Sequence, residues 1–247
     1  TNTVLGIYQG DQLMEHWRIE TSKGRTSDEY GLLMLSLLQH KGVTPDQIEG
    51  VMMSSVVPSI TYAFDSMAKR YLNRTALIVG PGFRTGMPIL TDNPKEVGAD
   101  RIVNAVAAFE RHNQACIVVD FGTATTFDCV SKKGEYLGGA IAPGFHISAE
   151  ALFQQTSKLP RIEVTRPKRA IGKNTVASMQ SGIFFGYLGL VEGTVRCIID
   201  ELGYRPRVIS TGGIAKLFEG ESSVIEEVDE FLTLRGLRIL YDRNCEP

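Results

Sequence analysis

At residues 116–130 the sequence reads CIVVDFGTATTFDCV. A run of apolar, mostly β-branched residues ends at Asp120, a glycine and several threonines follow, and a second run with strand propensity begins. This pattern predicts a β-hairpin whose tip carries Asp120, Gly122 and the hydroxyl groups of the following threonines. We expect the rest of the fold to be organised around this hairpin.

The tip of the predicted hairpin has the composition of a phosphate-binding site. Gly122 can adopt a positive φ or admit a close backbone approach, so backbone N–H groups and the hydroxyls of Thr123, Thr125 and Thr126 can converge on an oxyanion such as phosphate. Asp120 beside them can hold a cation that neutralises the phosphate. The alternative interpretation is a polar turn between two core strands, and the hairpin alone leaves both open.

The composition is that of an ordinary globular protein. The chain has 247 residues, 43% hydrophobic and 22% charged, and its net charge is −2, which suits one large or two small domains. The low charge and the absence of a Lys/Arg block predict no nucleic-acid partner. No apolar run approaches ~18 residues, so we expect no membrane span and a cytoplasmic location. The cysteines form no C-x-x-C pair, and Cys116 and Cys129 are expected to be reduced core thiols.

Helical and strand patterns alternate along the chain, which predicts an α/β fold. A capping box begins at Thr26, and Thr175 and Thr233 are expected to cap two later helices. The other expected elements are a strand pair over 1–8 and 13–19, strands at 51–57, 76–79 and 208–210, and a strand and turn over 138–144. The expected helices are at 60–71, from about 100 to 112, from about 148 and over 183–202.

The start of the chain resembles the hairpin at Asp120. Thr1-Asn2-Thr3 is followed by alternating residues and Gly10, much as Thr123-Ala124-Thr125 is followed by alternating residues and Gly134. The chain can therefore be read as two related halves that divide near residue 114, although chance similarity explains the pattern too. If the halves are related, a strand that ends in an acid and a glycine should precede Thr1.

Two such hairpins and a glycine turn would together clamp a nucleotide. The hairpin that includes Asn2 and Thr3 would hold one side of a triphosphate, and the Gly212-Gly213 turn would let the backbone approach an adenine or ribose. The ordinary role of such a glycine pair is entry into a helix. The sequence contains no G-x-x-x-x-G-K-[ST] or G-x-G-x-x-G motif, so phosphate binding would depend on the hairpins.

Asp100 is the second carboxylate of interest, since it lies in the first turn of a predicted helix. One interpretation is a general base that takes a proton from a substrate hydroxyl, with Arg101 fixing an anionic group of the substrate. The other is an acid that is favoured at a helix start by the helix dipole. Gly98 just before it would allow a ligand to approach the backbone.

Six motifs, in order over essentially the whole chain, resemble those of the type III pantothenate kinases. They are GADR at 98–101, DFGTATT at 120–126, GGAIAPG at 138–144, SKLP at 157–160, SMQSG at 178–182 and TGG at 211–213. The resemblance implies an α/β, actin-like fold of two ribonuclease-H-like domains with mixed five-stranded sheets flanked by helices. These domains would span 1–114 and 115–247, with the C-terminal helix able to pack back on the first.

The resemblance also implies an activity: ATP-dependent phosphorylation of pantothenate to 4′-phosphopantothenate, the first step of coenzyme A synthesis. Its cofactors would be ATP with Mg²⁺ and a monovalent cation, K⁺ or NH₄⁺, and the enzyme would be a homodimer. By analogy, Asp100 matches the proton acceptor and Asp120 the monovalent-cation site. The implied pantothenate contacts are Gly98, Ala99, Asp100, Arg101 and Thr175. The expected ATP contacts are Thr1, Asn2, Thr3, Gly122, Thr123, Gly212 and Gly213.

Two positions depart from the family pattern. The first phosphate motif of the family is D-x-G-N-T, of which Thr1 is the last residue, and loss of the preceding acid would remove a metal–phosphate ligand. Thr91 stands before Asp92-Asn93-Pro94 where relatives often have a tyrosine that touches pantothenate. The competing functions are a non-catalytic, actin-like nucleotide-binding module that acts as a transcriptional accessory protein, and a kinase for another small hydroxy acid.

Overall fold

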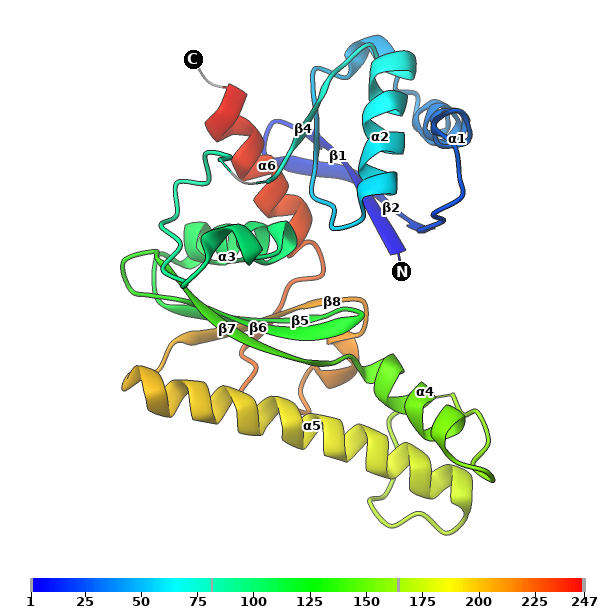
Figure 1. Cartoon of the computed structure of the whole chain (residues 1–247), viewed down its shortest axis with the longest axis vertical. Coiled ribbons are helices and arrows are strands. Elements are labelled where there is room, and N and C mark those ends of the chain that lie inside the picture. The colour runs from blue at the N-terminus through cyan, green and yellow to red at the C-terminus, as the bar shows by residue number, and fades with distance from the viewer. Residues whose placement is uncertain (1, 81, 164, 246–247) are drawn as a thin grey trace. The chain divides into compact units, whose positions relative to one another are not determined.

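The computed structural model describes residues 2–80, 82–163 and 165–245 (Figure 1). The chain forms two compact units, called here the first and the second unit. The first unit comprises Thr1–Gly86, Lys95–Val103 and Thr233–Pro247, and the second comprises Met87–Pro94 and Asn104–Leu232. The division near residue 114 into two ribonuclease-H-like domains stays a prediction.

The first unit contains the expected N-terminal strand pair. Strand β1 (Asn2–Gln9) pairs antiparallel with β2 (Gln12–Glu20). Gly10 has a φ of 56° in the turn between them, a conformation that glycine adopts without steric penalty. Exposed and half-buried residues alternate along both strands, as expected for a ribbon with one covered face.

A second strand pair in this unit is shorter than the sequence suggested. Strands β3 (Val51–Met53) and β4 (Ala76–Ile78) are parallel. The prediction of a strand over 51–57 is wrong beyond Met53, because the chain turns there to enter helix α2 (Pro58–Tyr71). Proline at the first helical position has the φ that a helix requires and lacks an N–H that would have no partner.

Helices complete the first unit. Helix α1 (Ser27–His40) begins with the predicted capping box, in which Glu29 N donates to Thr26 Oγ1 at 3.3 Å and Thr26 N donates to Glu29 Oε2 at 2.7 Å. Helix α6 (Leu232–Cys245) includes Thr233 within its first turn, so the prediction that Thr233 precedes the helix as its cap is wrong. A Cβ at Gly236 would lie 2.2 Å from Val103 O, so α6 packs here without a side chain.

The second unit is built on a five-stranded sheet. Its order is β7-β6-β5-β8-β9, and β5 pairs antiparallel with β6 but parallel with β8. The sheet is therefore mixed, and the predicted α/β class and central hairpin are confirmed. The strands are β5 (Cys116–Phe121), β6 (Ala124–Val130), β7 (Tyr136–Pro143), β8 (Arg207–Gly212) and β9 (Glu227–Val228).

Helices cover both faces of this sheet (Figure 1). Helix α5 (Thr175–Leu202) packs its buried residues Phe184 and Val191 in one core with Ile117 and Val119 of β5. The opposite face of β5 meets helix α3 (Ala99–His112), whose Ala108 carbonyl accepts a hydrogen bond from the Cys116 thiol at 3.8 Å. Because β5 is buried on both faces, it reads in the sequence as a continuous apolar run.

The remaining helices begin close to the predicted positions. Helix α4 (Phe145–Gln155) starts three residues before Ser148. The cap of α5 is Asn174, whose Oδ1 accepts from Ala177 N at 2.8 Å, so the assignment of Thr175 as the cap is wrong by one residue. Short 3₁₀ helices lie at Pro45–Gln47, Pro94–Glu96 and Ala215–Phe218.

Helix α5 is more apolar than we expected. An 18-residue window within it has a mean hydropathy of 1.4, and 22% of that window is buried. Length and composition alone would therefore allow this helix to cross a membrane, which corrects the expectation that no segment of the chain meets that test. A buried core helix meets the same test, and α5 places one side in the core of the second unit.

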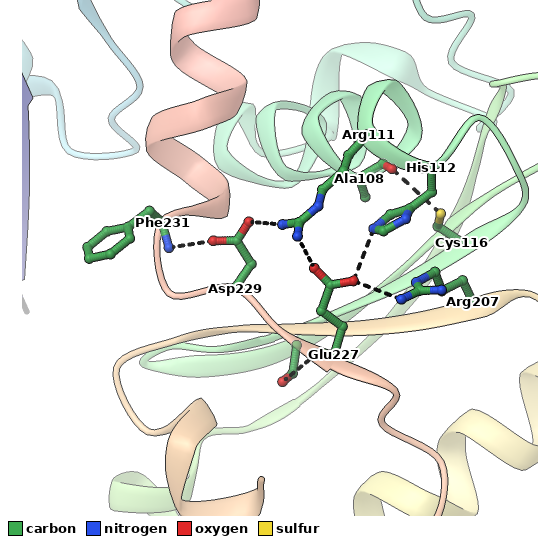
Figure 2. Close-up of polar contacts among 9 residues, drawn as sticks. Ala108, Arg111, His112, Cys116, Arg207, Glu227, Asp229 and Phe231 are labelled. Atoms are coloured by element: carbon green, nitrogen blue, oxygen red, sulfur yellow. Dashed lines mark hydrogen bonds and ion pairs between the residues drawn. The ribbon is translucent and has the colours of Figure 1, made fainter. Parts of the chain in front are cut away.

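A polar cluster joins α3, β8 and β9 at one end of the sheet (Figure 2). Glu227 forms ion pairs with Arg111 at 2.8 Å and with Arg207 at 3.0 Å. Arg111 also forms an ion pair with Asp229 at 2.9 Å. His112 Nε2 lies 3.3 Å from Glu227 Oε2. Burial lowers the pKa of His112, and the neighbouring arginines lower it further against the opposing effect of Glu227 and Asp229.

This cluster predicts a loss of stability in mild acid. An unfolded histidine takes up a proton below its ordinary pKa of about 6.5, whereas folded His112 resists protonation. The free energy of unfolding should therefore be fully retained above pH ~6.5 and fall as the pH decreases below it, with a slope of up to about 1.4 kcal/mol per pH unit. Urea unfolding between pH 5 and 8, as a rough range, measures this, and His112→Gln should flatten the profile. An unchanged profile in that variant would contradict the role of His112.

Candidate functional site

The central hairpin places its predicted functional residues at the ends of two parallel strands. Asp120 and Phe121 close β5, and Asp120 is paired with Thr211 and Phe121 with Gly212 of β8. Gly122 N donates to Ala124 O at 3.1 Å in the turn, and Gly122 and Thr123 are exposed. The exposed hairpin tip, Gly122 and Thr123, therefore presents backbone groups and one hydroxyl to solvent, whereas the Thr125 hydroxyl, expected at the tip, is buried.

Two glycines allow other strands to approach this tip. A Cβ at Gly144 would lie 2.1 Å from Thr123 O, so the chain leaving β7 passes against the turn without a side chain. Gly212 has a φ of 97°, and a Cβ there would lie 2.6 Å from both Phe121 O and Asp120 Oδ1. From the sequence we expected a glycine at position 212 because a ligand approaches the backbone there. The close packing of Gly212 against β5 is by itself a sufficient reason for a glycine at this position.

Asp120 is held by a buried amide. Asn104 of α3 donates from Nδ2 to Asp120 Oδ2 at 2.9 Å, and Asn104 is fully buried. The carboxylate therefore has one oxygen on Asn104 and the other beside Gly212. A hard cation prefers carboxylate oxygens as ligands, so the Asp120 carboxylate fits the predicted cation site.

The base of the hairpin is anchored in the core by a buried hydroxyl pair. The Thr125 and Tyr187 hydroxyl groups are hydrogen bonded, and Tyr187 also donates to Pro143 O at 3.3 Å. Burial raises the pKa of Tyr187, so its phenol stays protonated. Phe145 packs edge-on against Tyr187 with ring centroids 5.1 Å apart. Strand β6, helix α4 and helix α5 are thus joined directly beneath the tip.

The start of α3, in the first unit, brings together the predicted pantothenate segment. Arg101 N donates to Gly98 O at 3.1 Å and to Asp100 Oδ1 at 2.9 Å. The Asp100 carboxylate thus turns back over the helix N-terminus, and a Cβ at Gly98 would lie 2.7 Å from its Oδ1. Gly98, Ala99, Asp100 and Arg101 are half-buried. Both a helix-start acid and a proton acceptor are compatible with this geometry.

Thr175 lies at a cavity in the second unit. The cavity has a volume of about 870 Å³ and is lined by α4, the N-terminal part of α5 and the segment before it. Lys173, Asn174 and Thr175 contribute polar groups, whereas Leu152 and Met179 contribute apolar surface. A small molecule with an anionic group and an apolar body has the matching chemistry.

The remaining predicted ATP contacts fall in different parts of the chain. Thr1 lies outside the described residues. Asn2 and Thr3 open β1 in the first unit, where Thr3 Oγ1 is 2.9 Å from Thr21 Oγ1. Gly212 is the last residue of β8, in the second unit, and Gly213 follows it.

Two residues at this site were not identified from the sequence. Asn104 interrupts the otherwise apolar, fully buried stretch at 102–108 of α3, and a lone amide in such a stretch was a usable signal. Tyr187 gave no comparable signal, because a tyrosine among apolar helix residues is typical of an ordinary core.

Comparison with known proteins gives a consistent result. The family model described as type III pantothenate kinase matches residues 1–197. A type III pantothenate kinase of Myxococcus xanthus (strain DK1622) is 57% identical over 244 residues, which cover 99% of this chain and 95% of that protein. One from Anaeromyxobacter sp. (strain Fw109-5) is 59% identical over 244 residues, with coverages of 99% and 96%.

Among solved structures, a Baf family transcriptional activator from Campylobacter jejuni matches with a TM-score of 0.58. The alignment covers 93% of this chain and 91% of that protein at 16% sequence identity. At this identity the likeness concerns the fold alone.

The anchoring of the hairpin predicts energetic coupling between Thr125 and Tyr187. Thr125→Val and Tyr187→Phe should each lower the free energy of unfolding by about 1–2 kcal/mol, because each removes a buried hydrogen bond. The double variant should lose less than the sum, with a coupling of about 0.5–3 kcal/mol. Chemical unfolding of the four proteins measures this cycle.

Tyr136→Phe supplies a matched control, since Tyr136 donates to Asp128 Oδ1 at 2.7 Å in a separate interaction. Its effect should add to that of Thr125→Val within about 0.5 kcal/mol. Additive behaviour of Thr125→Val and Tyr187→Phe would show that the hydroxyl pair does not anchor the hairpin.

Proposed function

The chain belongs to the type III pantothenate kinase family, and on that premise we propose that it transfers the γ-phosphoryl group of ATP to the primary hydroxyl of pantothenate. The product is 4′-phosphopantothenate, in the first step of coenzyme A synthesis. The observation that carries this proposal is the similarity to enzymes of that name over essentially the whole chain. Asp100, Arg101 and Asp120 all lie within residues 1–197, which the family model matches.

Asp100 is the proton acceptor in this proposal. Its carboxylate lies at the N-terminus of α3, where Oδ1 accepts from Arg101 N at 2.9 Å. As the pantothenate hydroxyl attacks the γ-phosphorus, its proton passes to Asp100. Because enzymatic phosphoryl transfer depends chiefly on positioning and charge stabilisation, Asp100 would act mainly by orienting the hydroxyl. Gly98, Ala99 and Arg101 complete this segment, and Arg101 can pair with the pantothenate carboxylate.

The tip of the central hairpin is the proposed phosphate site. The proposed ATP contacts are Gly122, Thr123, Gly212, Gly213, Asn2 and Thr3. Asp120 would hold the monovalent cation, K⁺ or NH₄⁺, and Mg²⁺ would accompany ATP. Bound cations supply neutralisation of the phosphate charge.

Thr175 is the proposed pantothenate contact in the second unit. Its cavity combines Lys173 and hydroxyl groups with apolar side chains, and pantothenate combines a carboxylate with an aliphatic body. Relatives often have a tyrosine that touches pantothenate where this chain has Thr91, so that one contact is not part of the proposal. The transcriptional accessory function is not favoured, because its structural support is a likeness of fold alone. A substrate panel of small hydroxy acids separates a related kinase from the proposed one.

We also propose that the enzyme is a homodimer that pairs through α5, in the cytoplasm. Gly182, Gly186, Gly189 and Gly193 have open space where a Cβ would stand, and Phe185 on the same helix is exposed. Glycines at such spacing let two helices approach closely. Gly182 also lines the Thr175 cavity, which supports a substrate pocket close to the subunit interface.

The reaction predicts a specific defect in Asp100→Asn. The full-length protein should release ADP in a pantothenate-dependent manner, faster in K⁺ than in Na⁺ buffer. Asp100→Asn should lower kcat by about 10²–10⁴-fold, because loss of a general base removes an interaction made in the transition state. Binding of pantothenate and ATP, measured by calorimetry, should be retained.

Asp11→Asn is the matched control, since Asp11 lies in the β1–β2 turn with its side chain exposed. Its turnover should equal that of the wild type. No pantothenate-dependent turnover in either buffer would refute the proposed reaction, and an active Asp100→Asn enzyme would remove Asp100 from the mechanism.

The dimer predicts that a charge on the glycine face of α5 separates the subunits. Gly186→Glu should leave the monomer folded, because the position has open space and glutamate favours a helix more than glycine does. Light scattering after size-exclusion chromatography should give twice the chain mass for the wild type and one chain mass for the variant. Ser36→Glu, on an exposed position of α1, should remain dimeric. A monomeric wild type or a dimeric Gly186→Glu would count against this interface.

A further inference from the structure

The side chain of Asn104 is unusual for its surroundings. It is fully buried in α3, and the residues around it from Ile102 to Ala108 are apolar and buried as well. A buried amide loses its hydrogen bonds with water and must replace them within the protein. An apolar side chain of similar size would avoid that requirement. The presence of an amide at this buried position therefore needs a physical explanation.

The partner of Asn104 supplies that reason. Asn104 Nδ2 donates to Asp120 Oδ2 at 2.9 Å. Asp120 is on the face of β5 that meets α3, because side chains alternate along the strand and Ile117, Val119 and Phe121 pack in the core on the α5 side. Asn104 of α3 therefore supplies a donor to this carboxylate from the face of β5 that α3 covers.

The other carboxylate oxygen is placed by Gly212. Asp120 Oδ1 occupies space that a Cβ at Gly212 would enter, at 2.6 Å, and it is 3.9 Å from the position of a Cβ at Gly122. The carboxylate is thus oriented from two sides, with Oδ2 on the amide and Oδ1 toward the two glycine turns. Any larger side chain at Gly212 would displace this oxygen.

Asn104 is a neutral hydrogen-bond donor, and this determines whether Asp120 can still bind a cation. A lysine or arginine in place of Asn104 would neutralise Asp120 and compete with a bound cation. A neutral amide fixes the carboxylate and leaves its charge intact. Partners of this type behind a metal ligand commonly change metal affinity or activity by 10–100-fold, as an order of magnitude.

We infer that Asn104 is the positioning residue for Asp120, holding one oxygen so that the other faces the monovalent cation that accompanies ATP. This inference rests on the proposed function, because it concerns the cation site of that reaction. Asn104 itself touches neither substrate nor cation in this role. It acts through the orientation of Asp120.

The test compares Asn104→Leu with the wild type. Leucine has a similar size and favours a helix, while it removes the donor to Asp120 Oδ2. A loss of stability alone would leave the K⁺ activation constant unchanged, so that constant is the readout of positioning. The K⁺ concentration for half-maximal activation should rise about tenfold or more, with the KM for pantothenate unchanged and activity recovering at high K⁺. Asn104→Ala serves the same purpose if the leucine variant does not fold.

A binding measurement independent of turnover accompanies the kinetics. Replacing tetramethylammonium by K⁺ at constant ionic strength, with Mg·ADP present, should raise the melting temperature of the wild type. Asn104→Leu should lose most of that rise. Ser210→Ala, which removes a buried hydrogen bond to Glu227 O at 3.3 Å in the same sheet, should keep both the rise and the K⁺ activation constant.

The outcomes distinguish this inference from the proposed function. An Asn104→Leu enzyme with an unchanged K⁺ constant and an unchanged K⁺-dependent melting shift overturns the inference. A wild type that phosphorylates pantothenate with no dependence on monovalent cations also overturns it and leaves the proposed function standing. A wild type that does not phosphorylate pantothenate overturns the proposed function instead.

Discussion

Strand β5 is buried on both faces, between the α5 core on one side and α3 on the other, and the second unit depends on that packing. Burial on both faces requires an apolar strand and leaves polar residues only at its end. The first polar side chain after the apolar run, Asp120, stands where β5 and β8 finish together. The edge formed by the carboxyl ends of parallel strands is where α/β proteins commonly bind ligands.

The same packing explains how a flexible-looking turn can be held for catalysis. The hairpin tip is exposed, but the Thr125–Tyr187 pair ties its base to α5, and close glycine contacts fix the strand ends beside it. Asn104 then orients the Asp120 carboxylate from α3. Phosphoryl transfer gains most from groups already in position, so rigid support beneath a polar tip suits the proposed reaction.

Helix α3 connects the proposed roles within one element. Asp100, the proposed proton acceptor, and Asn104, the proposed support of the cation ligand, are one helical turn apart on it, and residues four apart share a helix face. Helix α5 has two different sides. One side fills the core, while its glycine face offers a surface for a second copy and borders the cavity at Thr175.

The sequence alone determined the hairpin, the capping box at Thr26, the α/β class and the family, because these depend on local periodicity, turn chemistry and ordered motifs. It misplaced the end of β3 and the caps of α5 and α6, because the exact ends of strands and helices depend on how the chain packs in the folded protein. Asn104, Tyr187 and the packing role of Gly212 became visible only in the folded structure. Each acts through a partner distant in sequence, such as Asp120 for Asn104, and no local pattern encodes which buried groups will meet.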